Sequence, residues 1–403
     1  MRNKPNTRSV FFSRALAVLC VLGASSVPWG DAGAAGPELQ TGVAMRSWSI
    51  DWDDDEVDVS QLSVPVLLKS PLGADGLGVT LFIAGARSEV DGSDLAKLGA
   101  ATDTELKFDY LMPNERVLLS GGASLPTGDT EFDEEGVVVS RAVSNQILGF
   151  RTNRYGEGFD YFGDVALAYP VSQTISIGAG AGFRYKGKYD FAPETSSALL
   201  DFDPGEEIFV SGGMSYLGRE GTATTTGNMD ITFRTYAEDE IVAEPVFQEG
   251  DEFEVRVTGS RRGERWSGGG MLRLVDKSDH EFLGDSELLA FGSPVEDVLL
   301  GNVTAGVLQV SFSLGFRVTP AVTLTAFAHS SRFQEVVVAA PSGGDDLIRR
   351  GKAAAHEPGL SLAWRARDAF TVHLTGSGLR GWAEDGDITI AGYDVSAGVA
   401  IGR

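Results

Sequence analysis

The chain has 403 residues, of which 51 are glycine and 22% are charged, and its formal net charge is −24. Its glycine content is well above the average of about 7%. The acidic balance excludes a nucleic-acid-binding protein, which needs a basic face to replace phosphate counterions. The single cysteine excludes an intrachain disulfide and a cysteine-based zinc site.

The N-terminal segment has the pattern of a secretory signal peptide. Arg2, Lys4, Arg8 and Arg14 precede an apolar run over residues 15–24, and small residues at 32–34 match a peptidase site. The apolar run is too short to span a bilayer. We therefore expect residues 1–34 to be a removed signal and residues 35–403 to form one exported barrel domain, with Cys20 leaving with the signal.

Two stretches follow in which polar and apolar residues alternate, at 41–52 and 57–69. They are either two further barrel strands or a plug inside the lumen. Pro65 weakens the second stretch as a strand, because proline cannot donate a hydrogen bond to the ladder.

Alternation with a period of two then recurs along the chain, most clearly at 103–112, 174–186, 228–236, 252–260 and 308–318. One face of each stretch is apolar and the other is polar, charged or glycine. A soluble barrel would fill its interior with apolar side chains, whereas a barrel in lipid keeps a polar interior. We predict an all-β, antiparallel transmembrane β-barrel, closed because lipid leaves no partner for an open edge.

The connections between these stretches alternate between short and long. Short turns at 112–115, 170–173, 217–221, 262–264, 319–321 and 367–369 alternate with long loops, of which 126–158 is the clearest. Such asymmetry is typical of barrels with short periplasmic turns and long external loops. Fourteen strands are clear from Leu77 to Ile401, so 14–16 strands are expected and 16 are favoured. We expect a short helix near 137–148, and acidic loops that are either solvated, the favoured interpretation, or bind divalent cations.

Three glycine-rich segments resemble a known family. These are VLLSGGASLPTGD at 117–129, the region 148–169 that ends RYGEGFDYFGDVALAY, and FDPGEEIFVSGGMSYLG at 202–218. They resemble outer-membrane barrels associated with the meta-pathway of phenol degradation, which are related to long-chain fatty-acid transporters. The resemblance implies passive uptake of small, often hydrophobic or aromatic, molecules. The final Gly402-Arg403 differs from the aromatic residue at which such chains commonly end.

Several charged residues of neighbouring strands are expected to point into the lumen. These pore-lining candidates are Arg184, Asp230, Arg234, Glu252, Glu254, Arg256, Arg265 and Arg273. They form either a ladder that sets ion selectivity or a network of cross-strand salt bridges. The salt-bridge interpretation is favoured, and the two are compatible.

One pair of residues raises the alternative of an enzyme. His329 and Ser331 lie two apart on a predicted strand, the spacing of the His-x-Ser pair in outer-membrane lipid hydrolases, which they resemble. Arg332 stands where those enzymes usually have asparagine, and alternation directs the pair toward the lumen rather than the lipid. A lipid hydrolase is therefore disfavoured.

The sequence thus predicts a channel of the bacterial outer membrane that takes up small molecules passively. A closed structural or surface barrel is the principal alternative. No phosphate loop, dinucleotide fingerprint or metal-ligand cluster is present, so we expect no enzyme activity, no cofactor and no metal. The expected partners are outer-membrane lipid, lipopolysaccharide, the outer-membrane assembly machinery and small solutes, with no nucleic acid.

Overall fold

The computed structural model describes residues 36–402 apart from 53–54, 73–75, 93–94, 114, 130–131, 157, 191–200, 242, 284–304 and 340–347. The expected signal peptide, residues 1–34, lies outside the described residues. No helix in the described part of the chain is both long and apolar enough to cross a bilayer.

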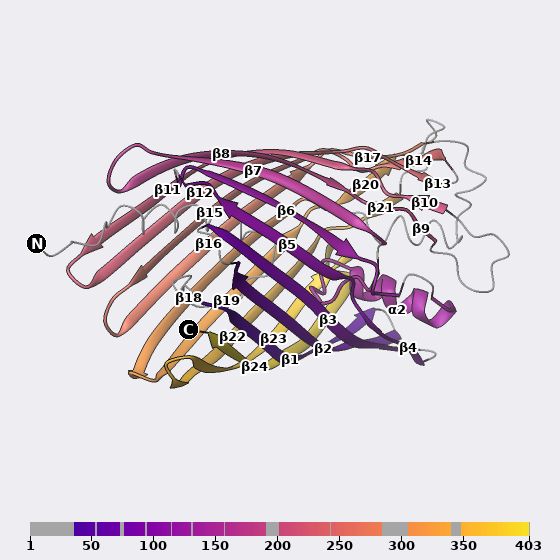
Figure 1. Ribbon diagram of the computed structural model, residues 1–403. Helices are drawn as coiled ribbons and strands as arrows, with labels where there is room; N and C mark the ends of the chain where they lie inside the picture. The colour runs from indigo at the N-terminus through magenta and orange to yellow at the C-terminus, as the bar shows by residue number, and fades with distance from the viewer. Residues whose placement is uncertain are drawn as a thin grey trace, which may run out of the picture.

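The chain forms a closed antiparallel β-barrel (Figure 1). Closure is explicit in the pairing, since β1 bonds to β2 on one side and to β24 on the other. β4 and β5 both pair with β3, one after the other along its length, so the two strands together fill one position in the wall. The wall therefore has 16 strand positions. The prediction of an antiparallel barrel with 16 strands is confirmed.

The wall strands are β1 (Glu38–Trp52), β2 (Asp55–Pro71), β3 (Leu77–Asp91), β4 (Leu95–Ala101), β5 (Thr104–Leu111), β6 (Val117–Leu125), β7 (Asp160–Pro170), β8 (Ile175–Tyr185), β11 (Glu207–Glu220), β12 (Ala223–Tyr236), β15 (Glu252–Arg262), β16 (Trp266–Lys277), β18 (Val307–Thr319), β19 (Val322–Phe333), β22 (Ala353–Arg367), β23 (Phe370–Ala383) and β24 (Ile388–Gly402).

The N-terminal pair belongs to the wall, so the alternative of a plug made by residues 41–69 was wrong. Pro65 lies inside β2 and interrupts the ladder to β1 without shifting it. The pairing passes from Thr41 opposite Val66 to Ala44 opposite Ser63 in one register. A proline lacks the N–H that the ladder needs, and the long strands on both sides hold the alignment across this gap.

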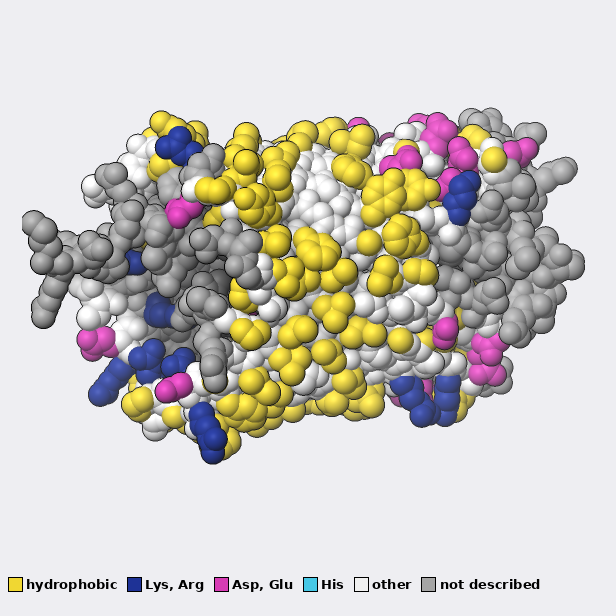
Figure 2. Space-filling view, in the orientation of Figure 1, with side chains coloured by type: hydrophobic (Ala, Val, Ile, Leu, Met, Phe, Trp, Pro, Cys, Tyr) yellow, Lys and Arg dark blue, Asp and Glu magenta, His cyan; other side chains and the backbone are white. Residues whose placement is uncertain are grey.

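The two faces of the wall differ as the alternation predicts. On β11 and β18, the exposed side chains include Ile208 (58%), Val210 (52%), Phe312 (65%) and Leu314 (55%). Figure 2 shows apolar side chains in a broad belt around the middle of the barrel, with charged side chains toward both ends. Successive residues of a strand point to opposite faces, so the polar residues between these apolar ones face the lumen.

A second, seven-stranded sheet lies at the end of the barrel that carries the long loops, which we call the long-loop end (Figure 1). Its strands are β9 (Tyr189–Asp190), β10 (Asp201–Asp203), β13 (Glu238–Ile241), β14 (Glu244–Gln248), β17 (His280–Phe282), β20 (Val336–Ala339) and β21 (Ile348–Arg350). Alternation did not predict this sheet, because its strands are too short to show a period. The opposite end, where β1 begins and β24 ends, is the short-turn end.

The loop between β6 and β7 contains the helix α2 (Glu134–Ser144). Asp133 caps it by accepting a hydrogen bond from the Gly136 N–H at 2.7 Å. The sequence predicted a helix near 137–148, so its presence is confirmed, with its bounds nearer the N-terminus. A short 3-10 turn, η1 (Glu384–Gly386), connects β23 to β24.

Candidate functional site

The lumen face can be assigned strand by strand from exposure. On β12, Met229, Ile231 and Phe233 are 40%, 39% and 44% exposed, and they alternate with Asp230 and Arg234. The same alternation on the neighbouring strands places seven predicted residues on the inner face. These are Arg184, Asp230, Arg234, Glu252, Glu254, Arg256 and Arg273.

Most of these charges pair with one another. Arg234 lies between Glu207 and Glu252, with N–O distances of 2.6 Å to each. Glu254 accepts from Arg256 at 2.6 Å and from Arg273 at 3.0 Å. We call these six residues, Glu207, Arg234, Glu252, Glu254, Arg256 and Arg273, the charge belt.

The neighbours of the charge belt are paired as well. Asp230 is in register with Arg256 on the next strand, and Arg184 approaches Asp160 at 3.4 Å. Lys277 binds Glu249 and lies 3.5 Å from Glu252. The arrangement agrees with the favoured interpretation of cross-strand salt bridges.

Arg265 differs from the other predicted residues. It lies in the turn between β15 and β16, where it is exposed, and its carbonyl accepts from the Arg317 N–H at 2.8 Å. The strand begins only at Trp266, so the inward strand position expected for Arg265 is not observed. It stands outside the charge belt at the short-turn end.

A second charged cluster lies on the other side of the lumen and was missed by the sequence analysis. Arg46 of β1 lies 2.8 Å from Glu357 of β22 and 3.0 Å from Asp394 of β24. Arg151, from the loop that carries α2, reaches the same Asp394 at 3.0 Å. The signal was present in the alternation of Ala44, Arg46 and Trp48, but a plug was still open as an alternative for that segment.

This cluster fastens the α2 loop to the inner wall. Arg46 donates to the carbonyl oxygens of Leu148 and Gly149, at 3.1 and 2.6 Å. The Trp48 indole N–H donates to the same Leu148 carbonyl at 2.7 Å. Gly149 adopts a φ of 55°, and a Cβ there would lie 2.9 Å from Arg46 Nη1, so the close approach requires glycine.

The next part of the loop is fastened to β2 and β3. Gln61 donates to the Thr152 carbonyl at 2.6 Å and accepts from the Thr152 N–H at 3.0 Å. Ser88 forms a hydrogen bond of 2.6 Å with the Tyr155 hydroxyl. We call residues 132–155 of this loop the insert. These are the residues that contact the lumen face of the wall.

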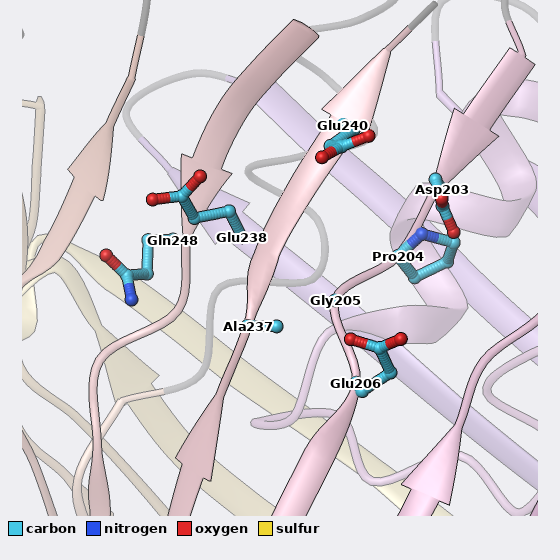
Figure 3. Close-up of a pocket in the computed structure, with 8 residues that line it drawn as sticks. All are labelled: Asp203, Pro204, Gly205, Glu206, Ala237, Glu238, Glu240 and Gln248. Carbon is cyan, nitrogen blue, oxygen red and sulfur yellow. The ribbon is translucent and has the colours of Figure 1, made fainter. Parts of the chain in front are cut away.

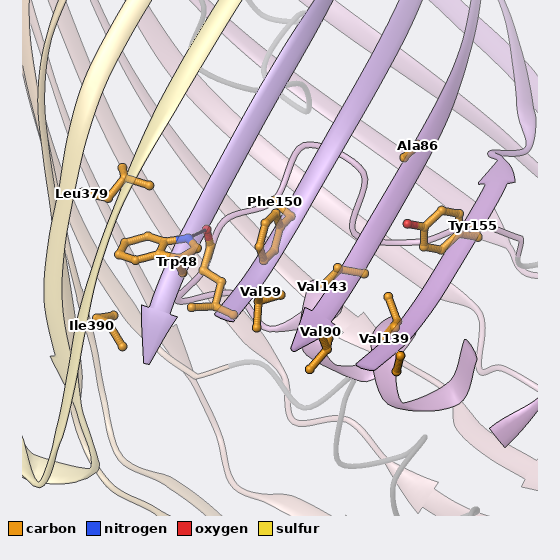
Figure 4. Close-up of a cluster of buried hydrophobic side chains, with 12 residues drawn as sticks. Trp48, Val59, Ala86, Val90, Val139, Val143, Phe150, Tyr155, Leu379 and Ile390 are labelled. Atoms are coloured by element: carbon orange, nitrogen blue, oxygen red, sulfur yellow. Dashed lines mark hydrogen bonds between the residues drawn. The ribbon is translucent and has the colours of Figure 1, made fainter. Parts of the chain in front are cut away.

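An apolar cluster completes the attachment of the insert (Figure 4). Trp48 and Val59 of the wall are each 1% exposed, and Val139 and Val143 of α2 are fully buried. Phe150 joins the same cluster from the loop. The insert is therefore packed against the wall, which narrows the lumen toward the long-loop end.

The His329–Ser331 pair is formed, but it is enclosed. Ser331 Oγ and His329 Nε2 lie 3.0 Å apart, while Ser331 is only 5% exposed. Glu357 is in register with His329, yet it accepts from Arg46 and from Ser377, and His329 Nδ1 has no hydrogen-bond partner among the described residues. The geometry of a nucleophile, base and orienting acid is thus incomplete.

A second histidine–serine pair lies on the outer face. Ser330 Oγ and His356 Nδ1 are 2.9 Å apart, and His356 lies on β22. The neighbouring residue on β23 is Arg380, so no carboxylate orients this imidazole from that side.

Carboxylates gather around a cavity of about 440 Å³ at the long-loop end (Figure 3). The lining includes Asp203, Glu206, Glu238 and Glu240. Nearby, burial raises the pKa of Asp239 to about 6, although its carboxylate accepts from the Gly205 N–H at 2.7 Å. Among the described residues, no group of three or more histidine, cysteine, aspartate or glutamate side chains is placed to hold a metal ion.

Neither a protein-family model nor a curated protein sequence matches the chain. Solved structures align with it at low identity. Pseudomonas aeruginosa OccK5 (OpdH) has 9% identity and a TM-score of 0.43 over 91% of this chain and 98% of that one. The outer membrane protein OpdK of the same organism has 10% identity and a TM-score of 0.41 over 90% and 98%. P. aeruginosa OccK2 (OpdF) in complex with glucuronate has 10% identity and a TM-score of 0.39 over 91% and 97%. Identity this low transfers no residue roles to this chain.

Proposed function

We propose that this chain is a channel of the bacterial outer membrane through which small molecules pass by diffusion. The observation that carries the proposal is the contrast between the two faces of one closed wall. The outer face is an apolar belt suited to lipid, and the inner face carries charged side chains in paired clusters. Charged side chains are solvated far better by water than by an apolar medium, so a lumen lined in this way is suited to water and polar solutes.

The insert gives the channel its narrow section. It is fastened through Trp48, Gln61, Ser88 and Arg46 of the wall, so its position does not depend on packing alone. In a passive channel, the width and the lining of the narrowest section decide which solutes pass. No catalytic residue is needed for this function.

The orientation follows from the two ends. The short turns face the periplasm and the long loops face outward, where they meet lipopolysaccharide, in keeping with the asymmetry of outer-membrane barrels. Export through the signal at 1–34 and insertion by the outer-membrane assembly machinery are part of the same proposal.

The substrate class divides into two candidates. The resemblance of residues 117–129 to the phenol meta-pathway barrels supports hydrophobic or aromatic solutes. The charge belt and the Arg46 cluster support polar solutes, because an apolar solute gains nothing from a lumen lined by ion pairs. Uptake of an aromatic solute and a polar solute of equal size into proteoliposomes would separate the two.

Single-channel conductance in a planar bilayer tests the proposal directly. Discrete conductance steps from refolded residues 35–403 are expected. Silence from protein that is verifiably folded would contradict an open channel, and it would favour a closed barrel whose lumen the insert seals. Release of fatty acid from added phospholipid that is lost in Ser331→Ala would instead favour a hydrolase.

A further inference from the structure

Four arginines lie on the lumen-facing side of consecutive hairpins at the short-turn end. They are Arg219 of β11, Arg262 of β15, Arg317 of β18 and Arg365 of β22. Each continues the inner face of its strand, and all four are exposed. We call these four residues the arginine crescent.

Hydroxyl side chains, not carboxylates, stand opposite the crescent. Thr224 is in register with both Arg219 and Arg262. The remaining partners in register are Ser267 for Arg262, Thr323 for Arg317 and Thr371 for Arg365. Within the described chain, Arg219, Arg317 and Arg365 make no ion pair. These three arginines of the crescent therefore keep their positive charge, unlike the arginines of the charge belt.

Other charged groups at this end offset one another. Exposed Glu264 and Asp368 lie in the turns, close to the exposed Arg265 and Arg367. Glu220 is on the outer face and pairs with Arg261 at 3.2 Å. Across the lumen, Lys107 pairs with Asp109 at 3.1 Å and Glu38 is in register with Lys69, while Asp164 adds one further carboxyl. The short-turn mouth thus remains positive on one side.

The long-loop end has the opposite charge. Its cavity is lined by four carboxylates, of which Asp203 pairs with Lys188 at 2.9 Å. The loop between β6 and β7 adds the exposed Asp129, Asp133 and Glu135, against the exposed Arg151 and Arg154. On the outer face in view, Figure 2 shows basic and acidic side chains at both ends, with acidic ones more numerous at the long-loop end and the apolar belt between the two ends. A solute that crosses the barrel meets a negative entrance, a paired middle and a positive exit in series.

We propose that this charge order selects small solutes that carry both charges and no net charge, such as free amino acids and other zwitterions. The inference rests on the proposed function, since it requires an open lumen. A net anion is repelled at the acidic entrance, and a net cation is repelled at the arginine crescent. A zwitterion has no net repulsion at either end, because its cationic group faces the carboxylates and its anionic group faces the arginines.

The same charge order has an electrical signature. When the long-loop side is positive, cations enter through the acidic end and anions enter through the arginine end, so both accumulate in the lumen and the current is large. The opposite potential depletes both ions. At ~10 mM salt the Debye length is ~30 Å, and at ~1 M it is ~3 Å, so the current should be asymmetric at low salt and symmetric at high salt.

Conductance of the full barrel with matched variants tests this. At about 10 mM salt, currents at opposite potentials of about 100 mV should differ by about twofold. Arg317→Gln with Arg365→Gln should reduce the difference to about half, because it removes two of the four arginines of the crescent. The control, Arg261→Gln with Arg367→Gln, removes equal charge from the same end. Arg261 lies on the outer face, and Arg367 lies after the register shift in β22, opposite Phe370 of β23. Neither belongs to the crescent, so the asymmetry of the current should persist in this control.

Solute flux provides the second test. Alanine, lactate and alaninol share a three-carbon skeleton and are a zwitterion, an anion and a cation at neutral pH. Proteoliposomes at low salt should admit alanine about threefold faster than either ion. Equal or faster entry of lactate or alaninol, or a symmetric current from an open pore, would overturn the inference. Absence of any conductance would instead contradict the proposed function, so the two failures are distinguishable.

Discussion

The two sides of the lumen use buried charge differently. On β11, β12, β15 and β16, the charge belt satisfies itself by cross-strand pairs such as Arg234 with Glu207 and Glu252. On β1, β22 and β24, Arg46 and Asp394 extend their contacts to Leu148, Gly149 and Arg151 of the insert. The first side stabilises the wall, and the second positions a separate segment inside it.

The difference shows why equal charges need not have equal roles. An arginine within a strand pairs with residues that the register places beside it on the adjacent strands. An arginine that holds a loop has partners far apart in the chain, and its loss frees that loop. Substitutions on the Arg46 side should therefore change the width of the lumen, and those on the charge-belt side should change only its charge.

The largest effect is expected for Trp48→Ala. Trp48 is 1% exposed and donates to the Leu148 carbonyl at 2.7 Å. Removing a buried aromatic side chain costs about 3–5 kcal/mol, so the insert should detach and single-channel conductance should rise. Trp266→Ala is the control, because Trp266 is 57% exposed on the outer face. Unchanged conductance and unchanged protease resistance of the insert would contradict the role assigned to Trp48.

Arg46→Gln should have the next largest effect. Asp394 is 1% exposed at its side chain and would keep only Arg151 as a charged partner. Breaking a buried ion pair from one side costs about 3 kcal/mol, and conductance should again rise. The double variant Arg46→Gln with Asp394→Asn should recover part of the stability, measured by thermal unfolding in detergent. If Arg234→Gln raised conductance as much, the contrast between the two sides would fail.

A pH effect is expected in the small sheet beyond the charge belt. The pKa of Asp239 is raised to about 6 from 3.8 by burial, so the folded sheet binds this proton more tightly than the unfolded chain does. The contribution of Asp239 to the free energy of unfolding is therefore fully present below its unfolded pKa of 3.8. This contribution, up to about 3 kcal/mol, is lost as pH rises through about 6.

Asp239 accepts a hydrogen bond from the Gly205 N–H, so hydrogen exchange at that amide would report this change. After correction for the intrinsic rate, its protection should fall between pH 4 and pH 7. Asp239→Asn should remove the dependence. Rising protection over that interval would show that the sign is wrong.

The smallest effect is expected from a single charge of the belt. Arg256→Ser leaves Glu254 with Arg273 alone and Asp230 without its neighbour in register, so the reversal potential in a salt gradient should shift toward cation selectivity. Arg265→Ser removes an equal charge from an exposed turn and should shift it less. Equal shifts would mean that the charge belt does not line the conducting path.

Much of the wall was predictable because a strand has a period of two. Residues 228–236 and 252–260 alternate so regularly that the inner positions of Asp230, Arg234, Glu252 and Glu254 followed directly. Arg265 was misplaced because alternation does not show where a strand ends and its turn begins. The seven-stranded sheet was missed because strands such as β10 (Asp201–Asp203) are too short to display a period.

The sequence by itself determined the barrel, its two faces and its alternation of short turns and long loops, since these depend on local periodicity and on the solvent around each face. Only the tertiary structure decided where the α2 loop lies, which brings Arg46, Asp394 and Arg151 together from distant parts of the chain. It also decided that the belt arginines are paired, while Arg317 and Arg365 make no ion pair with any residue that the structure describes. Closure of the ring sets which strands are neighbours, and no local pattern contains that information.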